Sequence, residues 1–147
     1  MSALSIVIGE NTPILRKKTV PIGTITKEIK KLLSDMKETV VVAKGAGIAA
    51  PQVGRNERLC IAMIGNKLVA LVNPFITWKS ETTAIAEEGC LSLPDLWMDV
   101  SRSTDIILEF QTEAGKKREL KLSGFDARVV QHEVDHLEGI LIVDHRK

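Results

Sequence analysis

The sequence predicts an α+β domain. Strand-like segments lie together in the middle of the chain, and two helix-like segments lie nearer its ends, which favours α+β over an alternating α/β order. The 147 residues suit one core, and they contain no internal repeat, linker-like tract or low-complexity segment. We therefore expect a single domain over residues 1–147.

The first helix is expected to run to about Lys44. Thr24 or Thr26 can cap its start, and Gly45 is expected to end it. Its lysines are expected to face solvent, because the apolar residues recur at helical spacing. These apolar residues are Ile29, Leu32, Leu33, Met36 and Val40.

Two β-hairpins are expected in the middle of the chain. In each, two strand-like runs are separated by a turn that contains Gly. Pro74 is expected to interrupt the extended pattern of the first hairpin. The predicted strands are residues 59–64 and 67–73, joined by Gly65-Asn66, residues 75–80, and residues 106–111 and 119–122, which flank a turn at Gly115-Lys116.

A second helix is expected to open near Gly124, with Asp126 as its N-cap, and to end at Gly139. Residues 140–143 then resemble a short strand. The helix turns an apolar side toward the core. That side consists of Val129, Val130, Val134 and Leu137.

The bulk composition excludes several classes of protein. Twenty basic and 19 acidic residues give a net charge of +1, which argues against specific nucleic-acid binding. No apolar run is long enough to cross a bilayer, so no membrane partner is expected. The N-terminus lacks the basic and apolar regions of a secretory signal. Cys60 and Cys90 do not suggest a disulfide scaffold, and a reducing cytosol is expected; Cys60 is expected in the core.

The most informative stretch is residues 131–136. His132 and His136 are four residues apart, so on a helix they lie on one side and can reach one metal ion. Glu133 is turned away from the two ligands and can act on a water at that metal. Activation of a water to attack a carbonyl is the chemistry that uses this set.

Two histidines do not complete a catalytic site of this kind, which has three protein ligands and one open position. Candidates for the third ligand are Glu138, Asp144 and His145 downstream and Cys90 upstream. Cys90 is equally compatible with a small buried apolar residue and with a thiolate ligand on a Gly-containing turn. The residues alone leave this choice open.

A third unusual stretch, residues 45–52, is rich in Gly and Ala. Its simple interpretation is a helix end followed by a turn of small residues. Its functional interpretation is a flat wall along which a substrate backbone lies, with the amide of Gln52 donating to the reacting carbonyl.

Together the three stretches resemble the peptide deformylase family. Residues 45–52 read GAGIAAPQ, residues 88–92 read EGCLS and residues 131–139 read QHEVDHLEG. The family is marked by Gly-φ-Gly-φ-Ala-Ala-x-Gln, where φ is apolar, then Glu-Gly-Cys-φ-Ser, then Gln-His-Glu-φ-Asp-His-Leu. All three occur here in the family's order and roughly its spacing, and the resemblance covers nearly the whole chain.

The resemblance implies a metal-dependent hydrolase of N-terminal processing in protein biosynthesis. It would remove the N-formyl group from the formyl-methionine of nascent peptides and release formate. Cys90, His132 and His136 would bind one divalent ion, natively Fe²⁺, with Zn²⁺, Ni²⁺ or Co²⁺ able to replace it. The implied fold has mixed and antiparallel sheets wrapped around a central metal-bearing helix, with the N-terminal helix outside.

Further roles follow from the same resemblance. Glu133 would be the general base and acid, and Gln52 with the backbone N–H of Leu91 would form the oxyanion hole. Gly47 would contact the substrate main chain, and Glu88 would help to shape the methionine pocket. The expected partners are N-formylmethionyl peptides and, transiently, the ribosome, in the cytoplasm or in an organelle of bacterial origin.

The chain departs from many relatives at two places. Trp97 stands where those relatives carry an Arg that can contact the peptide, and it would stack on the substrate or pack. The chain also ends soon after Gly139, which leaves any function of a C-terminal tail undecided. Gln131 and Asp135 are expected to orient the metal ligands.

Three alternatives remain open at this point. A deformylase relative that acts on another formyl or acyl substrate is consistent with Trp97. A metallopeptidase that cuts internal peptide bonds would use the same helix without Cys90. A non-catalytic module would close the metal site with a fourth ligand such as His145.

Overall fold

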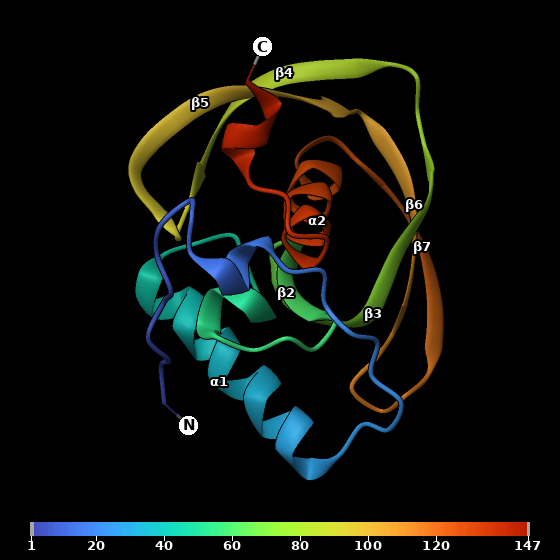
Figure 1. Cartoon of the computed structure of the whole chain (residues 1–147). Helices are drawn as coiled ribbons and strands as arrows, with labels where there is room; N and C mark the ends of the chain where they lie inside the picture. The colour runs from blue at the N-terminus through green and yellow to red at the C-terminus, as the bar shows by residue number, and fades with distance from the viewer. Residues whose placement is uncertain (1, 147) are drawn as a thin grey trace.

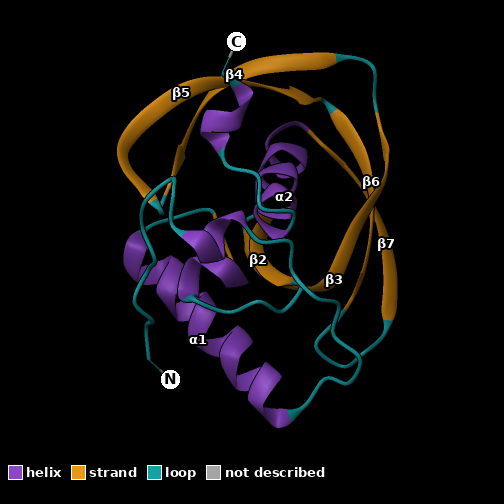
Figure 2. Cartoon of the chain, in the orientation of Figure 1, coloured by secondary structure: helices purple, strands orange, loops and turns teal. Residues whose placement is uncertain are grey.

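Two α-helices, seven β-strands and three short 3-10 helices make up residues 2–146, the part of the chain that this computed structural model describes. Figure 2 distinguishes the helices from the strands. In chain order, the elements are η1 (Pro13–Arg16), α1 (Lys27–Ala43), β1 (Gly47–Ala49), η2 (Ala50–Val53), β2 (Leu59–Ile64), β3 (Lys67–Lys79), β4 (Thr83–Cys90), β5 (Leu93–Ser103), β6 (Asp105–Gln111), β7 (Lys117–Ser123), α2 (Gly124–Leu137) and η3 (Ile142–His145).

The strands form two antiparallel sheets around α2. One sheet has five strands in the order β1-β2-β3-β6-β7, and the other is the β4–β5 hairpin. Figure 1 shows α2 enclosed between these strands, with α1 packed outside them. The predicted α+β fold, with a central helix and an outer N-terminal helix, is confirmed.

Helix α1 begins and ends nearly where the sequence predicts. Thr26 is the N-cap, and its side-chain oxygen accepts a hydrogen bond from the N–H of Ile29 at 3.2 Å. At the other end Lys44, one residue before Gly45, takes the left-handed conformation, with φ 56°. The N–H of Gly45 then bonds the carbonyl of Val40, which closes the last turn.

The first hairpin has the predicted turn but a longer second strand. Gly65 and Asn66 both have positive φ, as a two-residue hairpin turn requires. The prediction that Pro74 interrupts the extended pattern is wrong, because β3 continues through it with a shift of register. Proline lacks an N–H donor and is tolerated at such an irregularity. The carbonyl of Pro74 accepts from the guanidinium of buried Arg58.

Three other local predictions need correction. Residues 140–143 are not a strand, since the chain there leads into η3. Helix α2 begins at Gly124 with Ser123 as its N-cap, not at Asp126. The sequence patterns also missed the β4–β5 hairpin, because most of β4 is exposed and its apolar stretch, residues 84–86, is only three residues long.

Helix α2 packs its apolar side on the five-stranded sheet. Val130 and Leu137 are fully buried there, beside Cys60 of β2, which lies in the core as predicted. Helix α1 packs on other residues of β2 and β3 in a second cluster. The helix that carries the two histidines is therefore held by core packing along its length.

In the part of the chain that the structure describes, no helix has the length and apolar character needed to cross a membrane.

The placement of α1 predicts that two of its valines, two residues apart, contribute very differently to stability. Val40 is 1% exposed and Val42 is 66% exposed. We expect Val40→Ala to lower the free energy of unfolding by about 2 kcal/mol, because it removes two buried methyl groups. Val42→Ala should change it by less than about 0.5 kcal/mol. Urea unfolding of both variants measures the difference, and equal losses would contradict the packing of α1.

Candidate metal centre

The two histidines of α2 turn their rings toward each other. Their Nε2 atoms are 3.2 Å apart, and the ring centroids are 5.0 Å apart. His136 is buried, and burial lowers its pKa well below the ordinary value. A neutral imidazole is the form that binds a metal ion. The helical spacing therefore delivers two nitrogen donors to one point.

Cys90, the last residue of β4, brings its sulfur to the same point. Its Sγ is 3.4 Å from Nε2 of His136. Among residues 2–146, the cluster able to hold a metal ion consists of Cys90, His132 and His136, with donor atoms within 4.8 Å of one another. The three ligand residues expected from the resemblance thus lie together.

The other candidates for the third ligand are engaged elsewhere. Glu138 pairs with Arg58, and Asp144 pairs with Arg16. His145 lies 3.0 Å from Asp135 through its Nε2. None of these three residues belongs to the described cluster, so a closed site with His145 as a fourth ligand has no support in the geometry.

The chemistry of the cluster fits a divalent transition metal. One thiolate and two imidazoles suit iron or zinc better than hard cations, and three protein ligands leave a coordination position open. Burial lowers the pKa of His132, but its hydrogen bonds with Cys90 and Glu88 outweigh burial and raise that pKa to about 10. The negative charge that holds a proton there would also attract a metal cation.

The carboxylate of Glu88 contacts the ring nitrogen of His132 that faces away from the cluster. Its Oε1 lies 2.9 Å from Nδ1 of His132, so Nε2 is left to face the cluster. Arg102 donates to both carboxylate oxygens at 2.9 Å, and Arg128 donates to Oε2 at 2.6 Å. Burial raises the pKa of Glu88, but its hydrogen bonds with Arg102 and His132 outweigh burial and hold the pKa well below its usual range. Glu88 is therefore an ionised acceptor that orients a metal-binding ring.

Sequence reasoning missed both arginines. Arg128 could have been found, because it precedes His132 by four residues and so lies on the same side of α2. Arg102 carries no such local signal. It also donates to Asp135 at 2.6 Å, so Asp135 orients the arginine rather than a metal-binding ring. Gln131 bonds the backbone of Ser103, which ties α2 to β5 and does not contact a ligand.

Glu133 lies beside the cluster in a dry environment. It is 4% exposed, and its Oε1 has no hydrogen-bond partner among the described residues. Burial raises the pKa of Glu133 to about 7. A carboxyl group with that pKa can both accept and return a proton near neutral pH.

Gly47 makes room for that carboxylate. A Cβ atom built on Gly47 would lie 2.8 Å from Oε2 of Glu133 and 2.7 Å from the carbonyl oxygen of Ile61. Any larger residue would therefore displace Glu133 or the backbone of β2. Gly47 was expected to contact the substrate backbone, and it also borders the pocket.

The amide of Gln52 is oriented by its neighbours. Its Oε1 accepts from the N–H of Ala49 at 2.9 Å, which turns Nε2 toward the cluster. Nε2 is 3.2 Å from Oγ of Ser92 and 3.8 Å from Sγ of Cys90. Ser92, which is fully buried, is a further residue that sequence reasoning did not single out.

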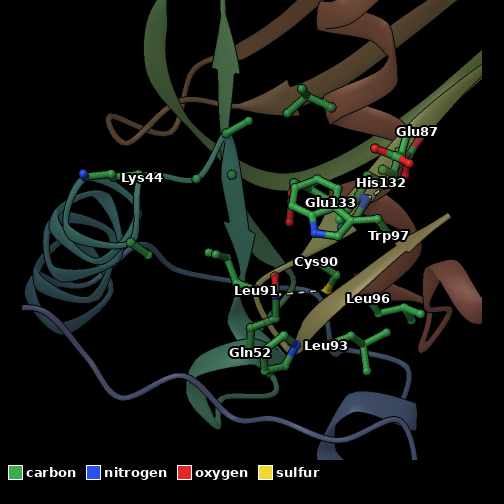
Figure 3. Close-up of a pocket in the computed structure, with 18 of the residues that line it drawn as sticks. Lys44, Gln52, Glu87, Cys90, Leu91, Leu93, Leu96, Trp97, His132 and Glu133 are labelled. Carbon is green, nitrogen blue, oxygen red and sulfur yellow. Dashed lines mark hydrogen bonds and ion pairs between the residues drawn. The ribbon is translucent and has the colours of Figure 1, made fainter.

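These groups line one pocket of about 480 Å³. Figure 3 shows Gln52, Cys90, Leu91, His132 and Glu133 around it. The other site residues expected from the resemblance, Gly47, Glu88 and Trp97, also line it. A metal ion held by this cluster beside a buried carboxyl group would supply the groups needed to hydrolyse a carbonyl compound in the pocket.

Comparison with known proteins agrees with this geometry. The family model of polypeptide deformylase matches residues 4–147. The peptide deformylase of Thermotoga neapolitana is 42% identical over 135 residues, which are 92% of this chain and 82% of the relative. The crystal structure of peptide deformylase from Thermotoga maritima has a TM-score of 0.95 at 39% identity, covering 99% of this chain and 98% of that chain.

A second solved structure is nearly as similar in fold. It is the Met-Ala-Ser-bound crystal structure of the class I type b peptide deformylase from Acinetobacter baumannii, with a TM-score of 0.93 at 33% identity over 98% of both chains. Family model, identity and fold all cover nearly the full length of the chain. The chain therefore belongs to the peptide deformylase family.

Proposed function

We infer that the chain is a metal-dependent hydrolase that removes the N-formyl group from the formyl-methionine of nascent peptides and releases formate. The observation that carries this conclusion is the convergence of Cys90, His132 and His136 within 4.8 Å beside Glu133. The rest of the proposal assigns roles to the residues around that point.

Cys90, His132 and His136 would hold one divalent ion. The ion supplies Lewis-acid activation of a water molecule near neutral pH. We propose Fe²⁺ as the native metal, with Zn²⁺, Ni²⁺ or Co²⁺ able to replace it, because the sulfur and nitrogen donors favour these metals over hard cations. Glu88 would keep the ring of His132 in the orientation that offers Nε2.

Glu133 acts as the base and then as the acid. Its unpartnered Oε1 is available to take a proton from the attacking water. It then gives that proton to the leaving amine nitrogen, so the products are formate and a free N-terminus. The pKa of about 7, raised by burial, suits a group that must do both.

Gln52 and the backbone N–H of Leu91 stabilise the charge that develops on the formyl oxygen. The amide of Gln52 is oriented toward the cluster before substrate binds, so little reorganisation is needed during the reaction. Each such donor contributes about 3 kcal/mol to transition-state stabilisation. Ser92 would keep the Gln52 amide in place.

The substrate backbone would lie along Gly47, with the methionine side chain beside Glu88. The carboxylate of Glu88 is neutralised by two arginines, so the pocket wall there is compatible with an apolar side chain. Phe125 and Val129 of α2 add apolar surface to the same pocket. The Met-Ala-Ser bound to the relative from Acinetobacter baumannii is the deformylated form of such a peptide.

The cellular setting follows from the substrate. Nascent formylated peptides emerge from ribosomes, so we propose the ribosome as a transient partner. We likewise propose the cytoplasm, or an organelle of bacterial origin, as the compartment, and a single domain as the functional unit.

One assay tests the function directly. Formate release from formyl-Met-Ala-Ser is measured without oxygen, because an iron–thiolate site is open to oxidation, and metal content is measured in parallel. We expect formate release in proportion to bound metal. Cleavage of unformylated Met-Ala-Ser would favour a metallopeptidase, and release from other acyl peptides but not from the formyl peptide would favour the alternative substrate class.

Replacing Glu133 separates metal binding from turnover. We expect Glu133→Gln to keep one metal ion per chain and to lower kcat by about 100-fold to 10,000-fold, because the proton acceptor is lost. Elemental analysis and formate release measure the two effects. Glu81→Gln, an exposed change in the turn before β4, is the control and should match the unmodified chain. Near-normal kcat in Glu133→Gln would mean that another group is the base.

The two cysteines give a matched pair. Cys90→Ala should lose the metal or bind it far more weakly, because it removes one of three ligands. Cys60→Ala should keep the metal, because Cys60 lies on strand β2 with its side chain buried in the core and outside the ligand cluster. Metal per chain after gel filtration measures both. Full metal occupancy in Cys90→Ala would contradict the proposed ligand set.

A methyl group at Gly47 should act through Glu133. Gly47→Ala would push on Oε2 of Glu133, so we expect kcat to fall by about 100-fold, as for a misplacement of about 1 Å, with metal content unchanged. Gly23→Ala is the matched control, because a Cβ there meets nothing within 4 Å. Equal activity of the two variants would show that Gly47 does not set the position of the carboxylate.

A further inference from the structure

One face of the β4–β5 hairpin, next to the pocket, has no role in the reaction described so far. In the register of the hairpin, Glu87 lies opposite Asp99 and Gly89 lies opposite Trp97. Because side chains alternate along a strand, these four residues share one face, and Glu88 points to the other. We call this set, Glu87, Gly89, Trp97 and Asp99, the outer face of the hairpin.

Trp97 lies directly on Gly89. A Cβ atom on Gly89 would come within 2.6 Å of Cζ3 of the indole, so the ring occupies the space that a side chain would fill. The indole is nevertheless 65% exposed and lines the pocket. Figure 3 labels Trp97 together with Glu133 and His132 among the residues that line the pocket. Trp97 thus presents an open aromatic surface to any peptide that reaches the metal ligands.

The outer face also carries two carboxylates without a cation. Glu87 and Asp99 are exposed and directly opposite each other, and neither side chain forms an ion pair or hydrogen bond among residues 2–146. Like charges directly opposite on a sheet repel each other. A positive group bound between them and over the indole would relieve that repulsion.

No cation of the pocket itself does so. Arg128 is bound to Glu88 on the inner side of the hairpin. Lys44 lies across the pocket, and Figure 3 shows its amine pointing away. The outer face is therefore both aromatic and negatively charged.

The path of an extended peptide determines which side chain meets this face. Successive side chains of an extended chain point to opposite sides. If the methionine side chain enters beside Glu88, on the inner side, the second side chain points to the outer side. Glu87 and Trp97 lie on that side of the hairpin.

We propose that Trp97, Glu87 and Asp99 select a basic residue, Lys or Arg, at the second position of the formylated peptide. The inference rests on the proposed function, because it needs the methionine in the pocket beside the metal ligands. The flat indole supplies a cation–π contact, and the paired carboxylates supply charge.

Four peptides test the preference: formyl-Met-Lys-Ser, formyl-Met-Ala-Ser, formyl-Met-Glu-Ser and formyl-Met-norleucine-Ser. Norleucine has an unbranched apolar stem like that of Lys but no charge. We expect kcat/KM for the Lys peptide to exceed that for the Ala and norleucine peptides by about threefold to tenfold, and the Glu peptide to be the poorest. The Lys advantage should shrink at high salt.

Variants assign the preference to the outer face. We expect the double change Glu87→Gln with Asp99→Asn to lower the ratio of kcat/KM for the Lys peptide to kcat/KM for the norleucine peptide. Trp97→Leu should lower this ratio to a similar value. Trp97→Phe should give a higher ratio than Trp97→Leu, because phenylalanine keeps an aromatic ring for the cation–π contact. Glu81→Gln, an exposed change in the turn before β4 and six residues before Glu87 in the chain, removes the same charge elsewhere and should leave the ratio unchanged.

Binding supplies a readout that does not depend on turnover. The chain has two tryptophans, so Trp78→Phe leaves Trp97 as the sole tryptophan fluorophore. Titration with the product Met-Lys-Ser should change its emission at a lower concentration than Met-Glu-Ser does. Equal kcat/KM for the Lys, norleucine and Glu peptides would overturn this inference and leave the deformylase function standing. Failure to release formate from all four peptides would instead contradict the function itself.

Discussion

The carboxylate of Glu88 joins the β4–β5 hairpin to helix α2, and the metal centre depends on that junction. It lies 2.9 Å from Nδ1 of His132. Cys90 follows Glu88 by two residues, after an irregularity in the pairing with β5, and its Sγ lies 3.4 Å from Nε2 of His136 on the same helix. One contact between strand and helix thus orients the ring of His132 from behind and brings the sulfur of Cys90 to its front.

Burying that carboxylate requires matching charge. Glu88 and Asp135 carry two negative charges and Arg102 and Arg128 carry two positive ones, so these four side chains balance one another, and the ring of His132 also pairs with Glu88. A balanced buried network adds little net stability, but removal of one member costs about 3–5 kcal/mol because a buried charge is left unpaired. The network therefore acts chiefly to fix one arrangement of the hairpin on α2, which is the arrangement that assembles the ligands.

The sequence pattern predicted the parts of the metal site that depend on neighbouring residues of one helix. The spacing of His132 and His136 identifies a metal-binding helix because both lie on one helical turn. The contact of Cys90 with His136 joins residues 46 apart in the chain, and it depends on a hairpin whose mostly exposed first strand has too short an apolar stretch, residues 84–86, to predict it. The resemblance to a family, rather than any periodicity, therefore supplied the third ligand.

The errors in the fold have the same origin. Pro74 and residues 140–143 were judged from local propensity, but distant side chains decide their structure. The guanidinium of Arg58 donates two hydrogen bonds to the carbonyl of Pro74 and so supports β3 at this irregular point. Arg16 pairs with Asp144 across the chain and so fixes the segment after Gly139 as a 3-10 turn. Neither partner is visible from the neighbouring residues.

The alternation of side chains along β4 separates reaction chemistry from peptide recognition. Glu88 and Cys90 point inward to the metal ligands, whereas Glu87 and Gly89 point outward to the face that carries Trp97. Inward residues are buried and coupled to α2 by paired charges, so most changes there disturb the ligands. Glu87, Trp97 and Asp99 on the outward face are exposed and have no such paired charges, so they can vary with little effect on the metal centre, whereas Gly89 must stay small beneath the indole. A single strand can thus keep the chemistry constant while the preference for the second peptide residue changes.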